Sequence, residues 1–284
     1  MSLFVMGYGR SGSTLLESLL VRSDSLNAFG EIKYFPERGV IKNEKCSCGV
    51  DVQNCEFWKE IKSSLGDWDY EALVKSTNKF ESSKFFFLNL LMLKIGIGKN
   101  ELEYYQRFNF KLLTELSKFG DFIDSSKMPA RLYFLHYGQG ENYRYKKVYW
   151  LVRDPRGVAY SCMKDVKRPE ANANDKKNGK MPKFGFVSSI IKWNINYIVS
   201  EYVANHFKSI TEKLWYEDVV NKKWEFVESD FSPLKHSVSG NPRRFTGGLE
   251  QIKVDDIWKS KLSNFQIKLA AILTKPFLRG SKSE

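Results

Sequence analysis

Short apolar runs alternate with longer amphipathic stretches along this 284-residue chain. The clearest run, Val-Tyr-Trp-Leu-Val at 148–152, is typical of a strand covered on both faces of a parallel sheet. Shorter runs predict strands at 3–6, 25–30, 119–124 and 214–216. Helical periodicity predicts helices at 14–20, 69–79, 102–119 and 184–207. This alternation predicts an α/β fold, a parallel β-sheet with helices on both faces and ligands at the carboxyl ends of the strands.

No linker rich in glycine, serine or proline divides the chain, so we expect one domain over 1–284. A stretch dense in aromatic residues and lysines predicts a helical insertion at about 37–118. Polar residues at about 164–183 predict a mobile loop. The apolar run at 85–97 is shorter than the roughly 20 residues of a membrane span. It predicts a buried helix, with a flap over an apolar acceptor or a membrane-surface contact as the alternative.

The charge balance favours an anionic partner, because 45 lysines and arginines outnumber 33 acidic residues and give a net charge of +12. Charge alone does not distinguish a nucleotide, a nucleic acid, an acidic glycan or a membrane surface. Nucleic acid is not expected, since no RNA-binding aromatic motif, helix-turn-helix signal or zinc-finger spacing is present. The first residues lack the basic and apolar pattern of a secretory leader, which predicts a cytoplasmic location.

Three of the four cysteines cluster in sequence, at Cys46, Cys48 and Cys55. A tetrahedral zinc site needs four ligands; no histidine lies nearby in sequence, and Cys162 is distant. Free thiols, a disulfide and a metal site therefore stay open. The histidines lack a sequence context typical of catalysis, and structural roles are expected for them. They are His136, His206 and His236.

The loop after the first strand, Gly-Tyr-Gly-Arg-Ser-Gly-Ser-Thr at 7–14, has the glycine spacing of a phosphate-binding loop. Ser13 stands where a Walker A loop has its lysine, which weighs against Mg²⁺-dependent triphosphate chemistry. Glycine turns and a helix N-terminus still offer N–H groups to an anion, and Arg10 supplies a cation. The candidate binding residues are Gly9, Arg10, Ser11, Gly12, Ser13 and Thr14.

This loop resembles the 5'-phosphosulfate loop of sulfotransferases that use 3'-phosphoadenosine-5'-phosphosulfate (PAPS), in which Lys or Arg precedes a Ser/Thr-Gly-Ser/Thr-Thr run. The resemblance implies a fold like that of P-loop nucleotide kinases, PAPS as sulfonate donor, and no metal ligand. Segment 148–161 resembles the family's 3'-phosphate segment and implies that Arg153 and Ser161 hold that phosphate. The alternatives are a local Arg153–Asp154 ion pair, and Asp154 as a Walker B carboxylate of a kinase.

Two weaker similarities extend further along the chain. Trp-Tyr-Glu-Asp at 215–218 resembles the family's Tyr-Glu-Asp element, which implies that Tyr216 lies near adenine. Residues 240–248 resemble the basic, glycine-bearing loop that closes over the 3'-phosphate, which implies that Arg244, or Arg243 beside it, contacts that phosphate.

The catalytic residues also follow from the resemblance. Glu31 lies in Phe-Gly-Glu-Ile-Lys, similar to the segment with the catalytic glutamate in the heparan and tyrosylprotein branches, and this implies a general base. The alternative is a helix-capping glutamate. Lys127 stands where the small-molecule branch often carries a histidine before Pro129. That departure favours Glu31 as base and implies that Lys127 holds the transferring sulfonate, with Arg10 on the leaving phosphate.

The implied activity is transfer of a sulfonate group from PAPS to an acceptor hydroxyl or amine, with release of 3',5'-ADP. The acceptor is expected to be a carbohydrate, a lipid or a small molecule. The competing functions are a P-loop nucleotide-dependent kinase and a non-catalytic relative that binds a nucleotide or glycan.

Overall fold

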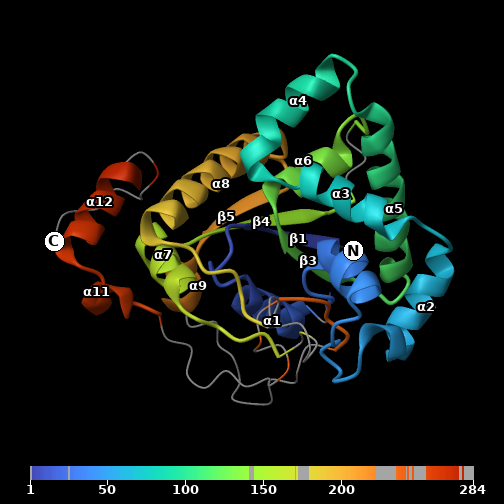
Figure 1. Ribbon diagram of the computed structural model, residues 1–284, viewed down its shortest axis with the longest axis horizontal. Helices are drawn as coiled ribbons and strands as arrows, with labels where there is room; N and C mark the ends of the chain where they lie inside the picture. Colours follow the sequence, from blue (N-terminus) through green and yellow to red (C-terminus); the bar gives the residue numbers. More distant parts are fainter. Residues whose placement is uncertain are drawn as a thin grey trace.

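A five-stranded, all-parallel β-sheet in the order β2-β3-β1-β4-β5 forms the centre of the computed structural model (Figure 1). The structure describes residues 2–24, 26–140, 144–169, 171, 179–221, 235–240, 242, 245, 254–274 and 277. The strands are β1 (Ser2–Gly7), β2 (Asn27–Ala28), β3 (Phe122–Lys127), β4 (Lys147–Val152) and β5 (Thr211–Trp215). The predicted α/β fold is confirmed, and each predicted strand lies within a few residues of an observed one.

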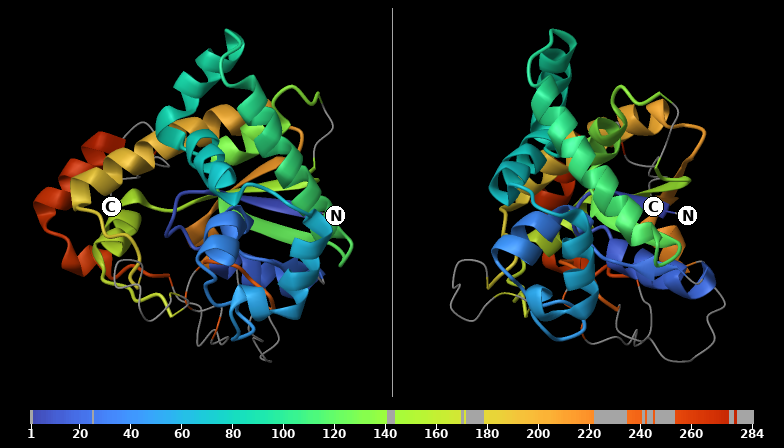
Figure 2. Two further views of the ribbon diagram at one scale, coloured as in Figure 1. Left: turned by 45° about the vertical axis from the view of Figure 1, so that its right-hand side comes forward. Right: turned by 90° about the vertical axis from the view of Figure 1, so that its right-hand side faces the viewer.

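Helices cover the sheet and fill the long connection between β2 and β3. The α-helices are α1 (Ser13–Asp24), α2 (Glu56–Leu65), α3 (Tyr70–Phe80), α4 (Phe86–Lys94), α5 (Lys99–Ser117), α6 (Pro129–His136), α7 (Pro155–Met163), α8 (Phe186–His206), α9 (Tyr216–Asn221), α11 (Trp258–Lys261) and α12 (Asn264–Thr274). Short helical turns are η1 (Ile32–Tyr34), η2 (Phe35–Ile41), η3 (Val52–Asn54) and η4 (Ser83–Phe85). Figure 2 shows that the connection rises from one side of the sheet, with α4 near its tip.

Both faces of the sheet are buried, as the continuous apolar runs predicted. Successive side chains of a strand point to opposite faces. Phe4 and Met6 of β1 therefore join the large core that α6, α8 and the β2–β3 connection build. Leu3 and Val5 pack on the other face, in a smaller core with α1 and α9. The helix that follows the predicted phosphate loop, α1, thus packs on this face and lies below the sheet in Figure 1.

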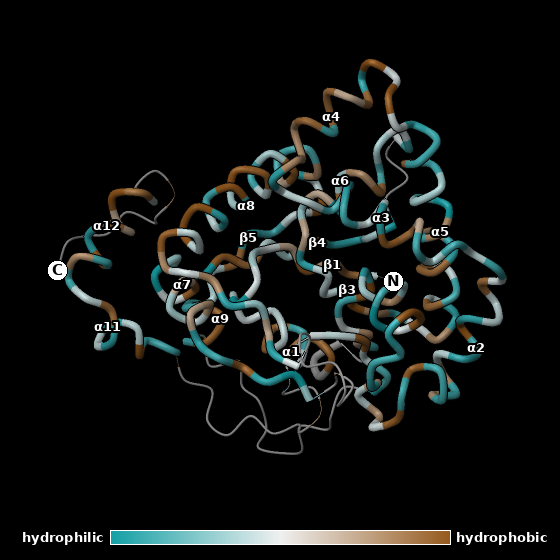
Figure 3. The backbone as a smooth tube through the Cα atoms, viewed as in Figure 1, coloured by the Kyte–Doolittle hydropathy of each residue, from teal (hydrophilic) through white to brown (hydrophobic). Residues whose placement is uncertain are grey.

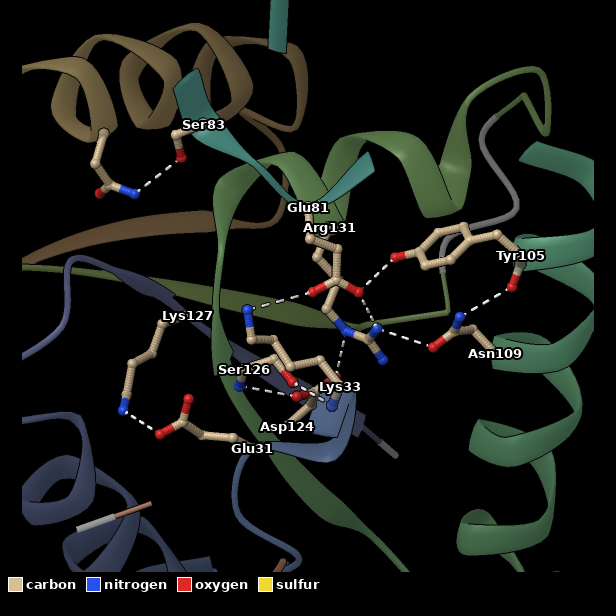
Figure 4. Close-up of polar contacts among 11 residues, drawn as sticks. Glu31, Lys33, Glu81, Ser83, Tyr105, Asn109, Asp124, Ser126, Lys127 and Arg131 are labelled. Atoms are coloured by element: carbon tan, nitrogen blue, oxygen red, sulfur yellow. Dashed lines mark hydrogen bonds and ion pairs between the residues drawn. The ribbon is translucent and has the colours of Figure 1, made fainter. Parts of the chain in front are cut away.

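A buried ion network joins β3 to the helical connection. The Arg131 side chain, which is fully buried, donates from Nε to Asp124 Oδ2 at 3.1 Å and from Nη1 to Glu81 Oε1 at 2.7 Å. The hydroxyls of Tyr145 and Tyr105 donate to the same two carboxylates, at 2.6 and 2.7 Å. Burial alone would lower the pKa of Arg131, but the two carboxylates hold it well above its usual value. The network ties the middle of β3 to α6 and to the end of α3 (Figure 4).

The apolar run at 85–97 is a helix, but the prediction that this helix is buried was only half right. Phe86, Leu90 and Leu93 are buried, whereas the opposite face of α4 is open, with Leu91 57% exposed. Figure 3 shows α4 as a largely hydrophobic segment at the edge of the molecule. Within the described ranges, no helix combines the length and the apolar character needed to cross a membrane.

The predicted mobile loop at about 164–183 is only partly within the described residues, because 170 and 172–178 lie outside them. Its described first part is anchored to the β2–β3 connection. There Arg168, 6% exposed, forms a buried ion pair of 2.6 Å with Glu44. The loop therefore begins against the same connection that follows Glu31.

Candidate functional site

The predicted phosphate loop joins β1 to α1 in a left-handed backbone path. Arg10 has φ +69° and Gly12 has φ +91°. A Cβ atom at Gly12 would lie 2.6 Å from Cδ2 of Tyr216, so both the backbone angle and the close approach require glycine there. Helix α1 begins at Ser13, directly after the loop. Since the first N–H groups of a helix have no intrahelical acceptor, the loop and α1 together present donors and a positive dipole end.

Two polar side chains of this loop lack partners within the part of the chain that the structure describes. The Ser11 hydroxyl is 1% exposed and has no hydrogen-bond partner there. The Arg10 guanidinium forms no hydrogen bond or ion pair there. Burial lowers the pKa of Arg10, although the nearby Cys162 and Glu31 partly offset this by favouring the charged form. A buried hydroxyl without a partner costs free energy, and a half-buried cation favours an anion beside it. Both groups are suited to ligand phosphate oxygens.

Arg153, which follows β4, reaches from the phosphate loop to the C-terminal segment. Its Nη1 donates to the Arg10 carbonyl at 3.0 Å, and its Nη2 donates to the Asp255 carbonyl and to Asp255 Oδ2, at 2.9 and 3.1 Å. Its guanidinium lies 4.5 Å from the centre of the Tyr216 ring. Ser161 lies half-buried on α7. The guanidinium thus already has one carboxylate beside it.

Asp154 does not pair with Arg153 in the way the alternative interpretation expected. Its carboxylate caps α7 by accepting from the Arg156 N–H at 2.8 Å, and it also forms an ion pair with the Arg156 guanidinium at 2.6 Å. The Arg156 guanidinium in turn lies over the ring of Trp258, 4.5 Å from its centre. Asp154 therefore has a structural role at the start of this helix.

Tyr216 is brought against the phosphate loop and Arg153, as its contacts with Gly12 show. Arg243 and Arg244 lie outside the described residues. Asp255, which no sequence motif indicated, links the two regions, because its N–H donates to the Tyr216 hydroxyl at 3.4 Å while its carboxylate pairs with Arg153.

Glu31 and Lys127 meet at the ends of the neighbouring strands β2 and β3. Lys127 Nζ lies 2.8 Å from Glu31 Oε1, and the side chains are only 15% and 13% exposed (Figure 4). Lys127, the last residue of β3, has a left-handed φ of +69°, which is uncommon outside glycine. Burial raises the pKa of Glu31, but Lys127, Arg38 and Lys33 together hold it below its usual value. Glu31 is therefore an ionised carboxylate at neutral pH.

Glu17 was missed by sequence reasoning, although its signal was a lone acidic residue within the apolar pattern of 14–20. It lies on α1, is 2% exposed, and accepts from the Gly30 N–H through Oε1 at 3.2 Å. Burial raises the pKa of Glu17 to about 7. Because Gly30 precedes Glu31, this contact joins the helix of the phosphate loop to the turn that carries the predicted base.

A segment from far along the chain completes this turn. The N–H of Glu31 donates to the Val238 carbonyl at 3.0 Å, and the N–H of Val238 donates to the Phe29 carbonyl at 2.9 Å. A Cβ atom at Gly30, with φ +75°, would lie 2.3 Å from Ser237 Oγ. Gly30 is thus required by close packing against the segment 235–240.

A comparison of the chain with models of protein families gives no match, and neither does a comparison with curated proteins. The geometry and chemistry of the site are therefore what indicates a function for this chain. The described site residues gather at one edge of the sheet in two adjoining groups. One group surrounds the phosphate loop with Arg153 and Tyr216, and the other is the Glu31–Lys127 pair.

The pH dependence of folding tests the assignment for Glu17. Between its usual value of 4.5 and about 7, the unfolded chain loses the Glu17 proton while the folded chain keeps it. The free energy of unfolding therefore falls as pH rises through this window, by about 3 kcal/mol. Glu17→Gln keeps an acceptor for Gly30, and we expect it to stabilise the protein by less than about 1 kcal/mol at pH 5 and about 3 kcal/mol at pH 8.

Urea denaturation of both proteins at the two pH values measures this difference. Glu60→Gln, at an exposed position on α2, is the matched control and should give the same small change at both. A Glu17→Gln effect that does not change with pH would show that Glu17 is not held protonated.

Proposed function

We propose that this chain transfers a sulfonate group from PAPS to a hydroxyl or amine of a carbohydrate, lipid or small-molecule acceptor and releases 3',5'-ADP. The observation that carries the proposal is the buried Glu31–Lys127 pair beside a phosphate loop whose cation is Arg10. The electrostatic interaction between Glu31 and Arg10 supports their sharing one site.

The reaction needs a base, a clamp on the sulfonate and a stabilised leaving phosphate. The acceptor oxygen or nitrogen would bond to sulfur as the bond from sulfur to the 5'-phosphate oxygen breaks, and the acceptor proton would pass to Glu31. Lys127 would donate to the transferring sulfonate or to the bridging oxygen, where negative charge develops. Arg10, the Ser11 hydroxyl and the N–H groups at the start of α1 would hold the 5'-phosphate.

The ionised Glu31 carboxylate suits the role of base, provided that Lys127 moves away from it. Its lowered pKa keeps it ionised and able to accept a proton, but an ion pair with Lys127 weakens its basicity. Once Lys127 turns its charge toward the sulfonate, Glu31 loses part of that stabilisation and becomes a stronger base. Donor binding would thus activate the base before the acceptor reacts.

The second phosphate of the donor fits the surroundings of Arg153. Asp255 Oδ2 lies 3.1 Å from the guanidinium, so a negatively charged oxygen is already accommodated at this position. A 3'-phosphate would replace the Asp255 carboxylate and accept two hydrogen bonds from the Arg153 guanidinium. Ser161 would be a further donor to this phosphate, and the Tyr216 ring would lie beside the nucleotide.

A kinase function is less well supported by the same residues. The Walker lysine position holds Ser13, and the carboxylate that resembled a Walker B aspartate, Asp154, is committed to Arg156 and to the start of α7. A non-catalytic binder of the same donor would share the binding residues and differ only in turnover.

Ligand-dependent melting tests the donor. With EDTA present, 3',5'-ADP at about 100 times its Kd should stabilise the protein by about 2.7 kcal/mol and raise Tm by roughly 4 to 5 °C. We expect Arg153→Gln to reduce the shift from 3',5'-ADP more than the shift from 5'-AMP, which lacks the 3'-phosphate. Arg156→Gln removes a nearby guanidinium that is paired with Asp154, and it should leave the melting shifts from 3',5'-ADP and from 5'-AMP unchanged. Stabilisation by ATP with Mg²⁺ but not by 3',5'-ADP would contradict the proposal.

Turnover tests the base. Glu31→Gln should lower the rate of 3',5'-ADP release from PAPS by about 10²- to 10⁴-fold across a panel of alcohols, amines and sugars. Its melting shift with 3',5'-ADP should stay close to that of the wild type, because Glu31 is not assigned to donor binding. Glu37→Gln, which removes an ion pair with Lys42 in the next turn, is the control and should keep its turnover. Wild-type turnover in Glu31→Gln would remove Glu31 from this role.

A further inference from the structure

Four potential metal ligands form a cluster next to the segments that flank the Glu31 turn. One of them comes from about 180 residues further along the chain than the others. They are Cys46, Cys48, Cys55 and His236. Their sulfur and nitrogen atoms all lie within 4.8 Å of one another. The sequence showed the three clustered cysteines but no fourth ligand near them, and a structural role was expected for His236. The fold supplies His236 instead, because the segment 235–240 packs against Gly30.

We propose that this Cys₃His cluster binds a structural Zn²⁺ ion. Thiolates and imidazole in a set of four are the ligands that tetrahedral structural zinc prefers. With Zn–S near 2.3 Å and Zn–N near 2.0 to 2.1 Å, a tetrahedron places two sulfurs about 3.8 Å apart and a sulfur and a nitrogen about 3.6 Å apart. The observed distances are 3.7 Å between Cys48 Sγ and Cys55 Sγ and 3.3 Å between Cys55 Sγ and His236 Nδ1.

The local backbone has the form of a ligand-bearing turn. Residues 46–49 form a tight turn in which the Gly49 N–H donates to the Cys46 carbonyl at 2.9 Å, and Gly49 has φ +99°. The turn is closed by the Cys46 N–H, which donates to the Val50 carbonyl at 2.8 Å. Cys46 and Cys48 are thus presented from one short turn, and Cys55 lies just before α2.

His236 is held in place by its own neighbours. It has a left-handed φ of +59°, a region that few residues other than glycine adopt, and its carbonyl accepts from Trp58 Nε1 at 2.8 Å. Its ring stacks on Phe57, with 4.9 Å between ring centres. The next residue, Ser237, donates from its N–H to Ser47 Oγ at 2.7 Å. These contacts hold the imidazole beside the cysteines, just as the residues around a metal ligand commonly fix its orientation.

A disulfide explains this arrangement less well. The Cys48–Cys55 sulfur separation of 3.7 Å is far from the roughly 2.05 Å of an S–S bond. A disulfide would also use two of the cysteines and give no reason for a third thiol and an imidazole at the same point. A zinc ion uses all four groups.

The proposed ion would stabilise the turn that carries Glu31. His236 belongs to the segment 235–240, whose Val238 pairs with Phe29 and Glu31, while the cysteines belong to the connection that follows Glu31. Zinc would therefore join the two chain segments that flank the Glu31 turn. This role is independent of which reaction the site performs.

Metal content of the full chain, expressed with added Zn²⁺ and purified without chelator, tests the proposal. We expect one zinc per chain by elemental mass spectrometry, with near-complete loss in Cys48→Ser and in His236→Asn. Cys162→Ser and His206→Asn are the matched controls and should keep one zinc per chain. On the wild type, a mercurial thiol reagent should release the zinc to a chromophoric chelator, so the test does not depend on the variants folding.

Zinc removal should also destabilise the turn that carries Glu31. Hydrogen exchange of the peptide that contains the Glu31 N–H should speed up on metal removal and recover when Zn²⁺ is restored. Less than about 0.1 zinc per wild-type chain, retention of zinc by both ligand variants, or a Cys48–Cys55 disulfide in the intact mass would each overturn the proposal.

Discussion

The requirement that a fully buried guanidinium be paired sets the geometry around the Glu31–Lys127 pair. Removing one partner of such a pair costs about 3 to 5 kcal/mol, so Arg131 keeps Asp124 and Glu81 in place. Asp124 lies three residues before Lys127 on β3, and Glu81 lies 3.9 Å from the Lys33 ammonium just after Glu31. One buried charge thus holds the positions from which the predicted base and its partner lysine approach each other.

Much of the architecture could be predicted because it depends on local patterns. The run at 148–152 is apolar on both sides, and this is what a central strand of a parallel sheet requires. The glycine and arginine positions of the phosphate loop follow from short-range backbone geometry. The meeting of Glu31 and Lys127 was predictable in outline, since residues that follow parallel strands gather at one edge of the sheet.

The residues that were missed depend on contacts between distant segments. His236 joins the cysteines only because Gly30 allows the segment 235–240 to pack closely. Asp255 reaches Arg153 from 102 residues further along the chain. The half-exposed α4 was mistaken for a buried helix because apolar residues occupy both of its faces, so hydropathy alone did not distinguish the buried face from the open one. Pairing of this kind has no periodic signal in a single sequence.

A crystal structure of the protein with 3',5'-ADP tests the central claim most directly, because it locates both phosphates without requiring an acceptor. The account predicts the 5'-phosphate on the loop of Arg10 and Ser11, and the 3'-phosphate on Arg153 and Ser161, with Asp255 displaced from the guanidinium. Glu31 and Lys127 should lie beside the 5'-phosphate. A nucleotide bound elsewhere, or one whose 5'-phosphate points away from Glu31, would contradict it.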